Sequence, residues 1–422
     1  MTVATQPTRS IVVIGGGIVG SSIAYYLSRS ATRAAAKITL VEASAAPAPA
    51  ASGKAGGFLA LDWHGAATAS LAELSFKLHC QLADQDGGHE KWGFREVETW
   101  QVNVDSNLKD EPSMKSKPAI SWLDNDIVRS TSNMGGGGTT AQVHPGQLTQ
   151  HLVDESRKAG VEVLFNSRAS SLRFLNDRNV NGIEVKDTKS GETKTLDVDD
   201  LVIAAGPWTG SLITQLFPRS LLPAHLKSAS FIDGSRAHSI VIESPPGKPL
   251  SADCLFTDMA YGPGGRKAGA PELYCRPDGT AYVCGGSDDV PLPDTADEVS
   301  FDEKKVAALI EQSKVLSPSS LDVESGATLR AKQACYLPIS NRTGNPIIGG
   351  KEGVYVAAGH SCWGITNSLG TGKVLSELIL DAKIGKNGAG RLGAEAEVIA
   401  VMVENRRADE HQPTARLVQI RA

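Results

Sequence analysis

The sequence has no strong excess of either charge, since its 422 residues carry a formal net charge of −5. It contains no cluster of lysines and arginines that would match a phosphate backbone, so nucleic acid is not an expected partner. No apolar run reaches transmembrane length, and the polar first ten residues show no signal-peptide pattern. The last residues do not form a Ser-Lys-Leu tail. These absences predict a cytoplasmic protein without a transmembrane segment.

The sequence also lacks paired cysteine motifs. Its six cysteines are scattered and form no C-x-x-C pair. A disulfide framework and a zinc site both need a regular cysteine spacing, so neither is indicated and no metal site is expected.

What the sequence does have is a glycine-rich turn between an apolar run and an amphipathic segment. Residues 11–14 are four β-branched apolar residues, typical of a strand buried on both faces of a parallel sheet. Gly15, Gly17 and Gly20 then occupy the positions of the G-x-G-x-x-G fingerprint. A pyrophosphate is expected on the free N–H groups where the following helix begins.

A second apolar run, residues 37–41, ends in Glu42. This acid falls about 20 residues past the glycines, where a carboxylate that binds the ribose hydroxyls belongs. Glu42 would repel a 2′-phosphate, so NADP is disfavoured. The alternatives are a glycine-rich turn in some other α/β protein and, more weakly, an NAD-dependent Rossmann dehydrogenase.

The strand patterns in the rest of the sequence indicate two domains. Residues 51–57 are a second stretch of small residues, which either brings backbone N–H groups to an anion or a flat ring, or is a flexible linker. Residues 201–208 and 353–359 resemble buried parallel strands, and residues 370–380 predict a core helix. The middle third has short strands broken by Gly and Pro, with a helix over 302–316.

We therefore expect an α/β fold with a Rossmann-like, dinucleotide-binding domain and a discontinuous, mainly antiparallel β substrate domain. The first would gather 1–90, 140–235 and 336–422. The second would hold 91–139 and 236–335.

Taken together and in order, these motifs resemble the FAD-dependent D-amino-acid oxidase superfamily, which includes glycine oxidase and sarcosine oxidase. The matching segments are residues 15–20 with Glu42, then 51–57, 204–208, 345–349 and 353–360. Within that superfamily the chain is most similar to a fungal branch of FAD-dependent oxidoreductases. The resemblance implies FAD, with its ADP half at the glycine turn and its ring near residues 52–57 and 359–366.

The resemblance also implies which residues form the site. The residues implied to bind the cofactor are Gly15, Gly17, Ile18, Val19, Gly20, Glu42, Ser52, Gly56, Gly57, Ala169, Gly206, Trp208, Cys335, Gly359, Cys362, Gly364, Ile365 and Thr366. The candidate catalytic residues are His360, Trp363, Arg276 and Lys54. For His360 the alternative is a hydrogen-bonded loop histidine.

The chain departs from the family pattern where amino-acid oxidases often carry an Arg-Pro that clamps the substrate carboxylate. Here residues 335–338 read Cys-Tyr-Leu-Pro. An α-amino acid would need Arg276, Arg342 or Lys54 instead, each of which could equally be a surface charge. Cys335 lies where the sarcosine-oxidase branch attaches FAD covalently. The favoured prediction is nevertheless that FAD is bound non-covalently and that Cys335 is a small residue of the core.

The predicted function is oxidation of a C–N bond of an amine or modified amino acid, by hydride transfer to the flavin. O₂ or another acceptor would reoxidise the flavin. The partner expected is a small-molecule amine. The alternative from another class is a non-catalytic or redox-sensing flavoprotein that acts as an intracellular interaction module.

Overall fold

The computed structural model describes residues 9–30, 36–107, 120–175 and 179–381. Predictions that fall on the other residues, such as the end of the FAD-binding domain at residue 422, lie outside the described part. No helix within these ranges combines the length and hydropathy that a membrane span needs.

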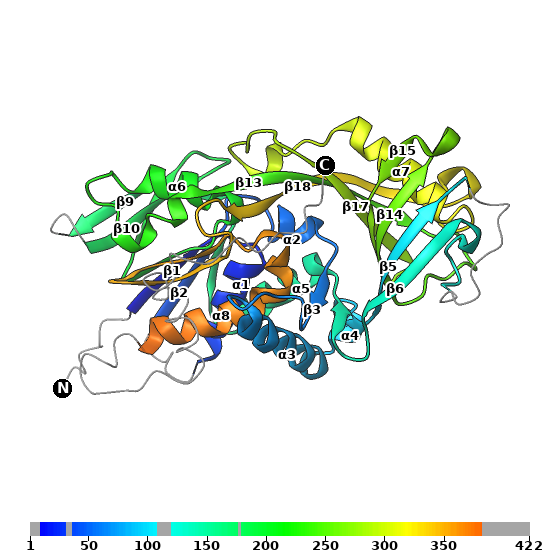
Figure 1. Cartoon of the computed structure of the whole chain (residues 1–422). Helices are drawn as coiled ribbons and strands as arrows, with labels where there is room; N and C mark the ends of the chain where they lie inside the picture. Colours follow the sequence, from blue (N-terminus) through cyan, green and yellow to red (C-terminus); the bar gives the residue numbers. More distant parts are fainter. Residues whose placement is uncertain (1–8, 31–35, 108–119, 176–178, 382–422) are drawn as a thin grey trace, which may run out of the picture.

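A six-stranded sheet forms around the first strand. The strand order is β19-β20-β12-β1-β2-β8, and all neighbours are parallel except the edge strand β19. The strands are β1 (Arg9–Ile14), β2 (Ala36–Val41), β8 (Glu162–Leu164), β12 (Asp200–Ile203), β19 (Ile347–Lys351) and β20 (Val354–Ala358). Segments from both ends of the described chain thus share one sheet (Figure 1).

This sheet is buried on both faces, because alternate residues of β1 point to opposite sides. Ile11 and Val13 pack with residues of three helices. These are α1 (Ile18–Arg29), α5 (Pro145–Lys158) and α8 (Gly364–Asp381). Val12 and Ile14 pack on the opposite side with α6 (Thr209–Leu216) and with a three-stranded sheet. That sheet consists of β9 (Ser167–Leu175), β10 (Asn179–Asp187) and β11 (Thr193–Asp197).

The middle third builds an eight-stranded sheet in the order β18-β13-β17-β16-β14-β5-β6, with β15 beside β14. Its pairs are antiparallel except β5 with β14. The strands are β5 (Glu98–Asp105), β6 (Val128–Gly135), β13 (Ile232–Glu243), β14 (Asp253–Tyr261), β15 (Lys267–Gly269), β16 (Glu272–Cys275), β17 (Thr280–Asp288) and β18 (Thr328–Ser340). Residues of α7 (Glu303–Leu316) join the apolar core on one face of this sheet.

A third, small sheet lies between these layers. It pairs β3 (Phe58–Ala60), β7 (Thr140–Gln142) and β4 (Arg95–Glu96) in the order β3-β7-β4. The helix α2 (Ala51–Lys54) precedes β3, and the helices α3 (Ala69–Asp86) and α4 (Gly88–Lys91) follow it. Figure 1 shows β13 and β18 running side by side across the top of the molecule, from the region of α6 to the strands of the larger sheet.

The predicted fold class is confirmed, with three local differences. The helix predicted from 302 begins at Glu303, because the Asp302 carboxylate caps it. The last helix begins at Gly364 rather than at residue 370. The glycines within it do not break the helix but allow close packing, since a Cβ on Gly372 would lie 2.6 Å from Ser22 of α1. Residues 51–54 form a short helix, where a flexible linker was one of the two alternatives.

The domain limits stay a prediction. Two of them, at 235/236 and 335/336, fall inside β13 and β18. Both strands pair along their whole length within the eight-stranded sheet.

Candidate functional site

The glycine turn allows β1, α1 and β12 to approach one another closely. Gly15 has a φ of +111°, and a Cβ there would lie 2.3 Å from the Ala204 carbonyl oxygen. A Cβ on Gly20 would lie 1.9 Å from the carbonyl oxygen of Gly15. The residue that precedes α1, Gly17, has no side chain that could cap the helix, and the first turn of α1 carries no acid. This helix N-terminus therefore suits an anion such as a pyrophosphate.

Glu42 follows β2 at the same edge of the sheet. Its carboxylate accepts hydrogen bonds from the backbone N–H of Gly16 at 2.6 Å and of Ser44 at 2.9 Å. Burial raises the pKa of Glu42, although these N–H groups act in the opposite direction. Glu42 thus adjoins the glycine turn as predicted, and its contact with a ribose stays a prediction.

The small residues 51–57 pack between the glycine turn and the larger sheet. Ser52 Oγ accepts a hydrogen bond from the backbone N–H of Ile18 at 2.9 Å. A Cβ on Gly56 would lie 2.6 Å from the Tyr274 ring, and one on Gly57 would lie 1.9 Å from the Val143 carbonyl oxygen. This segment is therefore held on several sides and is not a flexible linker.

Three further cofactor candidates lie on two elements. Ala169 is buried on β9. Gly206 and Trp208 form a short helical turn after β12. The Trp208 indole donates a hydrogen bond to the Pro293 carbonyl oxygen at 2.7 Å, so its ring is turned toward the segment after β17. Their contact with FAD stays a prediction.

The loop after β20 leads from Gly359 into α8 and is fixed by hydrogen bonds. Thr366 Oγ1 donates to the Phe58 carbonyl oxygen at 3.1 Å. His79, which the sequence analysis did not single out, donates from Nε2 to the Ile365 carbonyl oxygen at 3.0 Å. The loop that contains Cys362, Trp363 and Gly364 is thereby tied to both β3 and α3.

His360 lies inside the protein and is only 3% exposed. Its Nε2 is 3.2 Å from the Thr371 hydroxyl of α8. Burial lowers the pKa of His360 to about 4, so the ring is neutral at pH 7. This environment favours the alternative in which His360 is a hydrogen-bonded loop histidine. A catalytic role for His360 stays a prediction.

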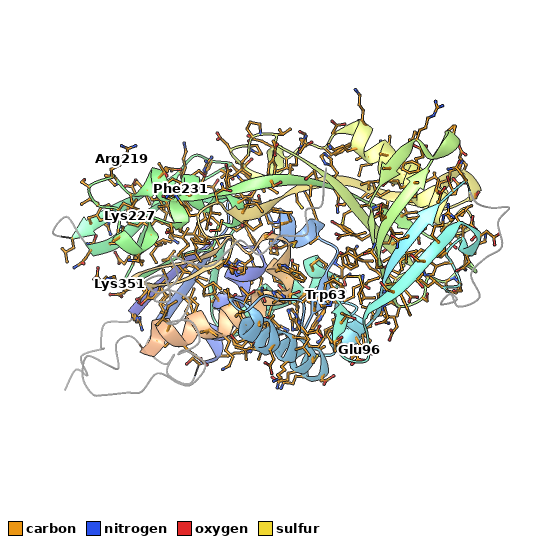
Figure 2. All side chains as sticks on the ribbon, in the orientation of Figure 1. Trp63, Glu96, Arg219, Lys227, Phe231 and Lys351 are labelled. Atoms are coloured by element: carbon orange, nitrogen blue, oxygen red, sulfur yellow. The ribbon has the colours of Figure 1, made fainter. Side chains whose placement is uncertain are left out.

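Of the three cations proposed to replace the missing clamp, Arg276 contacts the residue next to Lys54, whereas Arg342 lies in another part of the molecule. Arg276 is 6% exposed, donates from Nη2 to the Ala55 carbonyl oxygen at 3.2 Å and lies 5.5 Å from the Tyr282 ring centre. Its Nε has no partner among the described residues. Arg342 is exposed and stacks on Phe231, 4.1 Å from the ring centre. Figure 2 places Phe231 at the left of the view, far from Trp63 near its centre.

Lys54 lies next to Cys335. Its backbone carbonyl accepts a hydrogen bond from Gln333 Nε2 at 3.3 Å, and its charge acts on the Cys335 thiol. Burial raises the pKa of Cys335 to about 11, while Lys54 opposes the rise. Cys335 is therefore a buried thiol at neutral pH.

We expect acid precipitation of the purified holoprotein to release its FAD into the supernatant, because a protonated thiol is a poor nucleophile for attachment to the flavin. The absorbance of the supernatant near 450 nm measures this. A Cys335→Ser variant should retain as much flavin as the unmodified protein. Flavin that stays with the pellet, and is released by Cys335→Ser, would overturn this prediction.

A cluster of aromatic rings connects the segments that were predicted to hold the flavin ring. Ring centres are 5.0 Å apart for Phe58 and Trp63, 5.2 Å for Trp63 and Phe256, and 6.4 Å for Trp63 and Trp363. Phe58 lies 5.7 Å from Tyr274. We call these five residues the aromatic cluster. Of its members the sequence analysis singled out only Trp363, since the others acquire a meaning only when the strands pair.

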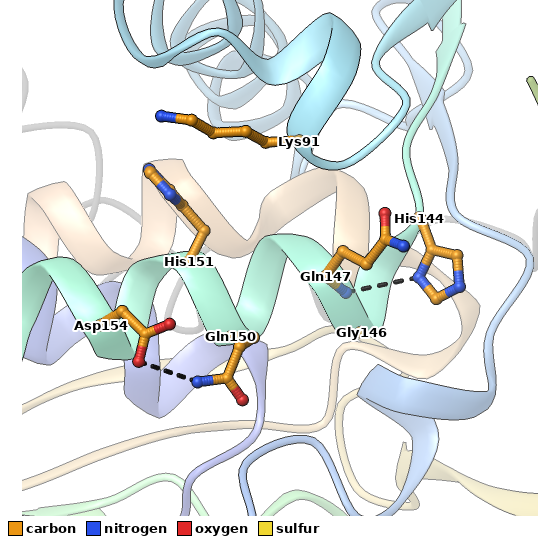
Figure 3. A pocket seen from close by; sticks show the side chains of 7 residues that line it. All are labelled: Lys91, His144, Gly146, Gln147, Gln150, His151 and Asp154. Carbon is orange, nitrogen blue, oxygen red and sulfur yellow. Dashed lines mark hydrogen bonds between the residues drawn. The ribbon is translucent and has the colours of Figure 1, made fainter.

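A separate open pocket lies along α5 (Figure 3). It is lined by Lys91, His144, Gly146, Gln147, Gln150, His151 and Asp154. His144 Nδ1 accepts a hydrogen bond from the backbone N–H of Gln147 at 3.3 Å, and Gln150 donates to Asp154 at 2.9 Å. None of the predicted site residues lines this pocket.

Known proteins resemble this chain over most of its length. Residues 10–378 match the family model described as FAD dependent oxidoreductase. The chain is 39% identical to C1F5.03c of Schizosaccharomyces pombe, covering 89% of this chain and 95% of that protein. It is 28% identical to TDA3 of Saccharomyces cerevisiae, covering 90% of this chain and 93% of that protein. Both names class these proteins with the oxidoreductases.

Solved structures resemble the fold. Glycine oxidase from Bacillus cereus superimposes with a TM-score of 0.65 at 19% identity, covering 89% of this chain and 98% of the other. L-proline dehydrogenase from P. horikoshii superimposes with a TM-score of 0.66 at 16% identity, covering 92% of this chain and 96% of the other. At these identities the likeness concerns the fold alone.

Proposed function

Because the chain belongs to the family of FAD-dependent oxidoreductases, we propose that it oxidises a C–N bond of an amine that is not held through an α-carboxylate. The observation that carries this proposal is the missing arginine clamp for a substrate carboxylate. Leu337 stands where amino-acid oxidases often have the arginine clamp, and Arg342 stacks on Phe231 instead. Arg276 is held by the Ala55 carbonyl oxygen.

The described residues fit FAD. The N-terminus of α1 would hold the pyrophosphate, Glu42 would hold the ribose, and the segments 52–57 and 359–366 would hold the ring. When bound, FAD supplies the acceptor for the hydride of a C–H group beside the amine nitrogen. Electrons would leave toward O₂ or another acceptor, and the oxidised substrate, an imine, would be hydrolysed by water to a carbonyl compound.

The chain's own residues would position the amine. The rings of the aromatic cluster would exclude water from the C–H group and present flat faces to the substrate. The Thr366 hydroxyl, bonded to the Phe58 carbonyl oxygen, fixes the loop of Trp363 against the strand of Phe58. Such fixed spacing is what hydride transfer requires, because the reacting atoms must lie in near contact.

The competing function is a non-catalytic or redox-sensing flavoprotein, and one experiment distinguishes the two. The FAD-loaded protein is mixed without oxygen with a panel of primary, secondary and tertiary amines and with the corresponding α-amino acids. We expect bleaching of the flavin absorbance by at least one amine, and weaker or no bleaching by its α-carboxylated counterpart. A flavin that dithionite reduces but no panel member reduces would favour the non-catalytic alternative.

A further inference from the structure

The face of the eight-stranded sheet opposite α7 carries a carboxylate in the midst of the aromatic cluster. Glu272 and Phe256 are direct partners in the pairing of β16 with β14, so their side chains lie beside each other on the same face. Tyr274 follows two residues after Glu272 and shares that face. Its hydroxyl donates a hydrogen bond to Glu272 Oε2 at 2.5 Å.

The second feature of Glu272 is the lack of a cationic partner among the described residues. Among the described residues it forms no ion pair with a lysine, arginine or histidine. Its other hydrogen-bond donor is the weak thiol of Cys284, at 3.6 Å. Burial raises the pKa of Glu272, as expected for a carboxylate that lacks a compensating charge. An acid in this setting is stabilised by any cation that reaches it.

The groups around Glu272 remain partly accessible. Glu272, Phe58, Trp63, Phe256 and Trp363 are all only partly buried. The charge of Glu272 also acts on the thiol of Cys362, which precedes Trp363. Glu272 therefore lies close to the loop after β20 as well as to β14.

We propose that Glu272 and the rings of Phe256, Trp63 and Phe58 form a subsite that captures a substrate amine in its cationic, alkylammonium form. The nitrogen would pass its proton to the Glu272 carboxylate, and the neutral amine would then lose the hydride. Both components favour the same ligand, since a carboxylate attracts a cation and the face of an aromatic ring does too. Both also disfavour a substrate carboxylate. The inference rests on the proposed function, because it names the substrate class for the same site.

The test compares ligands of nearly equal shape that differ in charge. Choline and its neutral analogue 3,3-dimethylbutan-1-ol are titrated into the FAD-loaded protein, and binding is followed by calorimetry and by the visible flavin spectrum. We expect choline to bind at least about tenfold more tightly than the alcohol. The acid 3,3-dimethylbutanoate should bind more weakly than the alcohol. Equal affinities for choline and the alcohol would overturn the proposal without any mutation.

A pair of matched variants locates the charge. In Glu272→Gln, the affinity for choline should fall several-fold toward that for the alcohol, because only the attraction of the rings for the cation remains. The affinity for the alcohol should stay unchanged, which shows that the site is still folded. The control, Glu303→Gln, removes the same charge from an exposed position on α7 and should leave both affinities unchanged. An unchanged preference for choline in Glu272→Gln would refute the role of this carboxylate.

The readout separates this inference from the proposed function. The quaternary nitrogen of choline has no lone pair to assist hydride loss at its adjoining C–H bonds, so the assay measures binding and not turnover. A protein that binds choline selectively but is reduced by no amine would refute only the proposed function. A protein reduced by amines that binds choline no better than the alcohol would refute only the cation subsite.

Discussion

The Gly20→Val substitution is expected to reduce the FAD content of the purified protein to the detection limit and to lower its stability by several kcal/mol. Even a single added carbon at this position would lie 1.9 Å from the Gly15 carbonyl oxygen. Relief requires α1 to move away from the turn, which would displace the helix N-terminus that is predicted to hold the pyrophosphate. The flavin-to-protein absorbance ratio and the urea midpoint measure the two effects.

A matched control separates this clash from a general effect of replacing glycine. Gly65 has no atom within 4 Å of its added Cβ and no positive φ. Gly65→Val should therefore keep full flavin content and change the urea midpoint little. If Gly20→Val retains FAD at the level of Gly65→Val, the assignment of this turn to the cofactor is wrong.

The second large effect is a loss of stability in mild acid, caused by two histidines that are buried in the neutral form. His79 and His360 are 2% and 3% exposed. Burial lowers the pKa of each from 6.5 to about 4. Because the folded-state pKa lies below the unfolded one, the stabilisation is complete above pH 6.5 and is lost as the pH falls toward 4. At pH 5 the loss is on the order of 2 kcal/mol for each histidine.

This effect is measured by urea unfolding at pH 7.5 and pH 5. Glu42, whose pKa is raised, changes stability in the opposite direction, so a variant is needed to isolate the histidine. In His79→Gln the loss between the two pH values should be smaller than in the unmodified protein by about 2 kcal/mol. The control His89→Gln, at an exposed position, should keep the full loss. An identical loss in His79→Gln and the unmodified protein would contradict the prediction.

Much of the fold follows from local sequence patterns. The strand at 11–14, the glycine turn and Glu42 lie within about 30 residues, and their spacing alone specifies a βαβ unit. The parallel sheet that joins both ends of the chain is predictable as well, because residues 201–203 and 354–358 carry the same buried-strand pattern. The cap at Asp302 shifts a helix boundary by one residue only.

The candidate catalytic residues show where local patterns stop being informative. His360 follows a strand that ends at the predicted flavin site, which suggests chemistry, yet its ring is buried against Thr371. Arg342 lies close in sequence to the expected clamp position, yet it stacks on Phe231 at a different part of the molecule. In both cases the direction of the side chain depends on contacts with segments that no local spacing encodes.

The sequence by itself therefore determined the class of cofactor and the parallel sheet, because a nucleotide-binding turn is a short-range pattern of glycines, apolar residues and one acid. The tertiary structure decided the character of the candidate active site. Its aromatic cluster collects side chains from residue 58 to residue 363, and Glu272 acquires its neighbours only through the register of β14, β16 and β17. Such a site depends on strand pairing between distant segments, and a register shift of one residue would turn Glu272 to the opposite face.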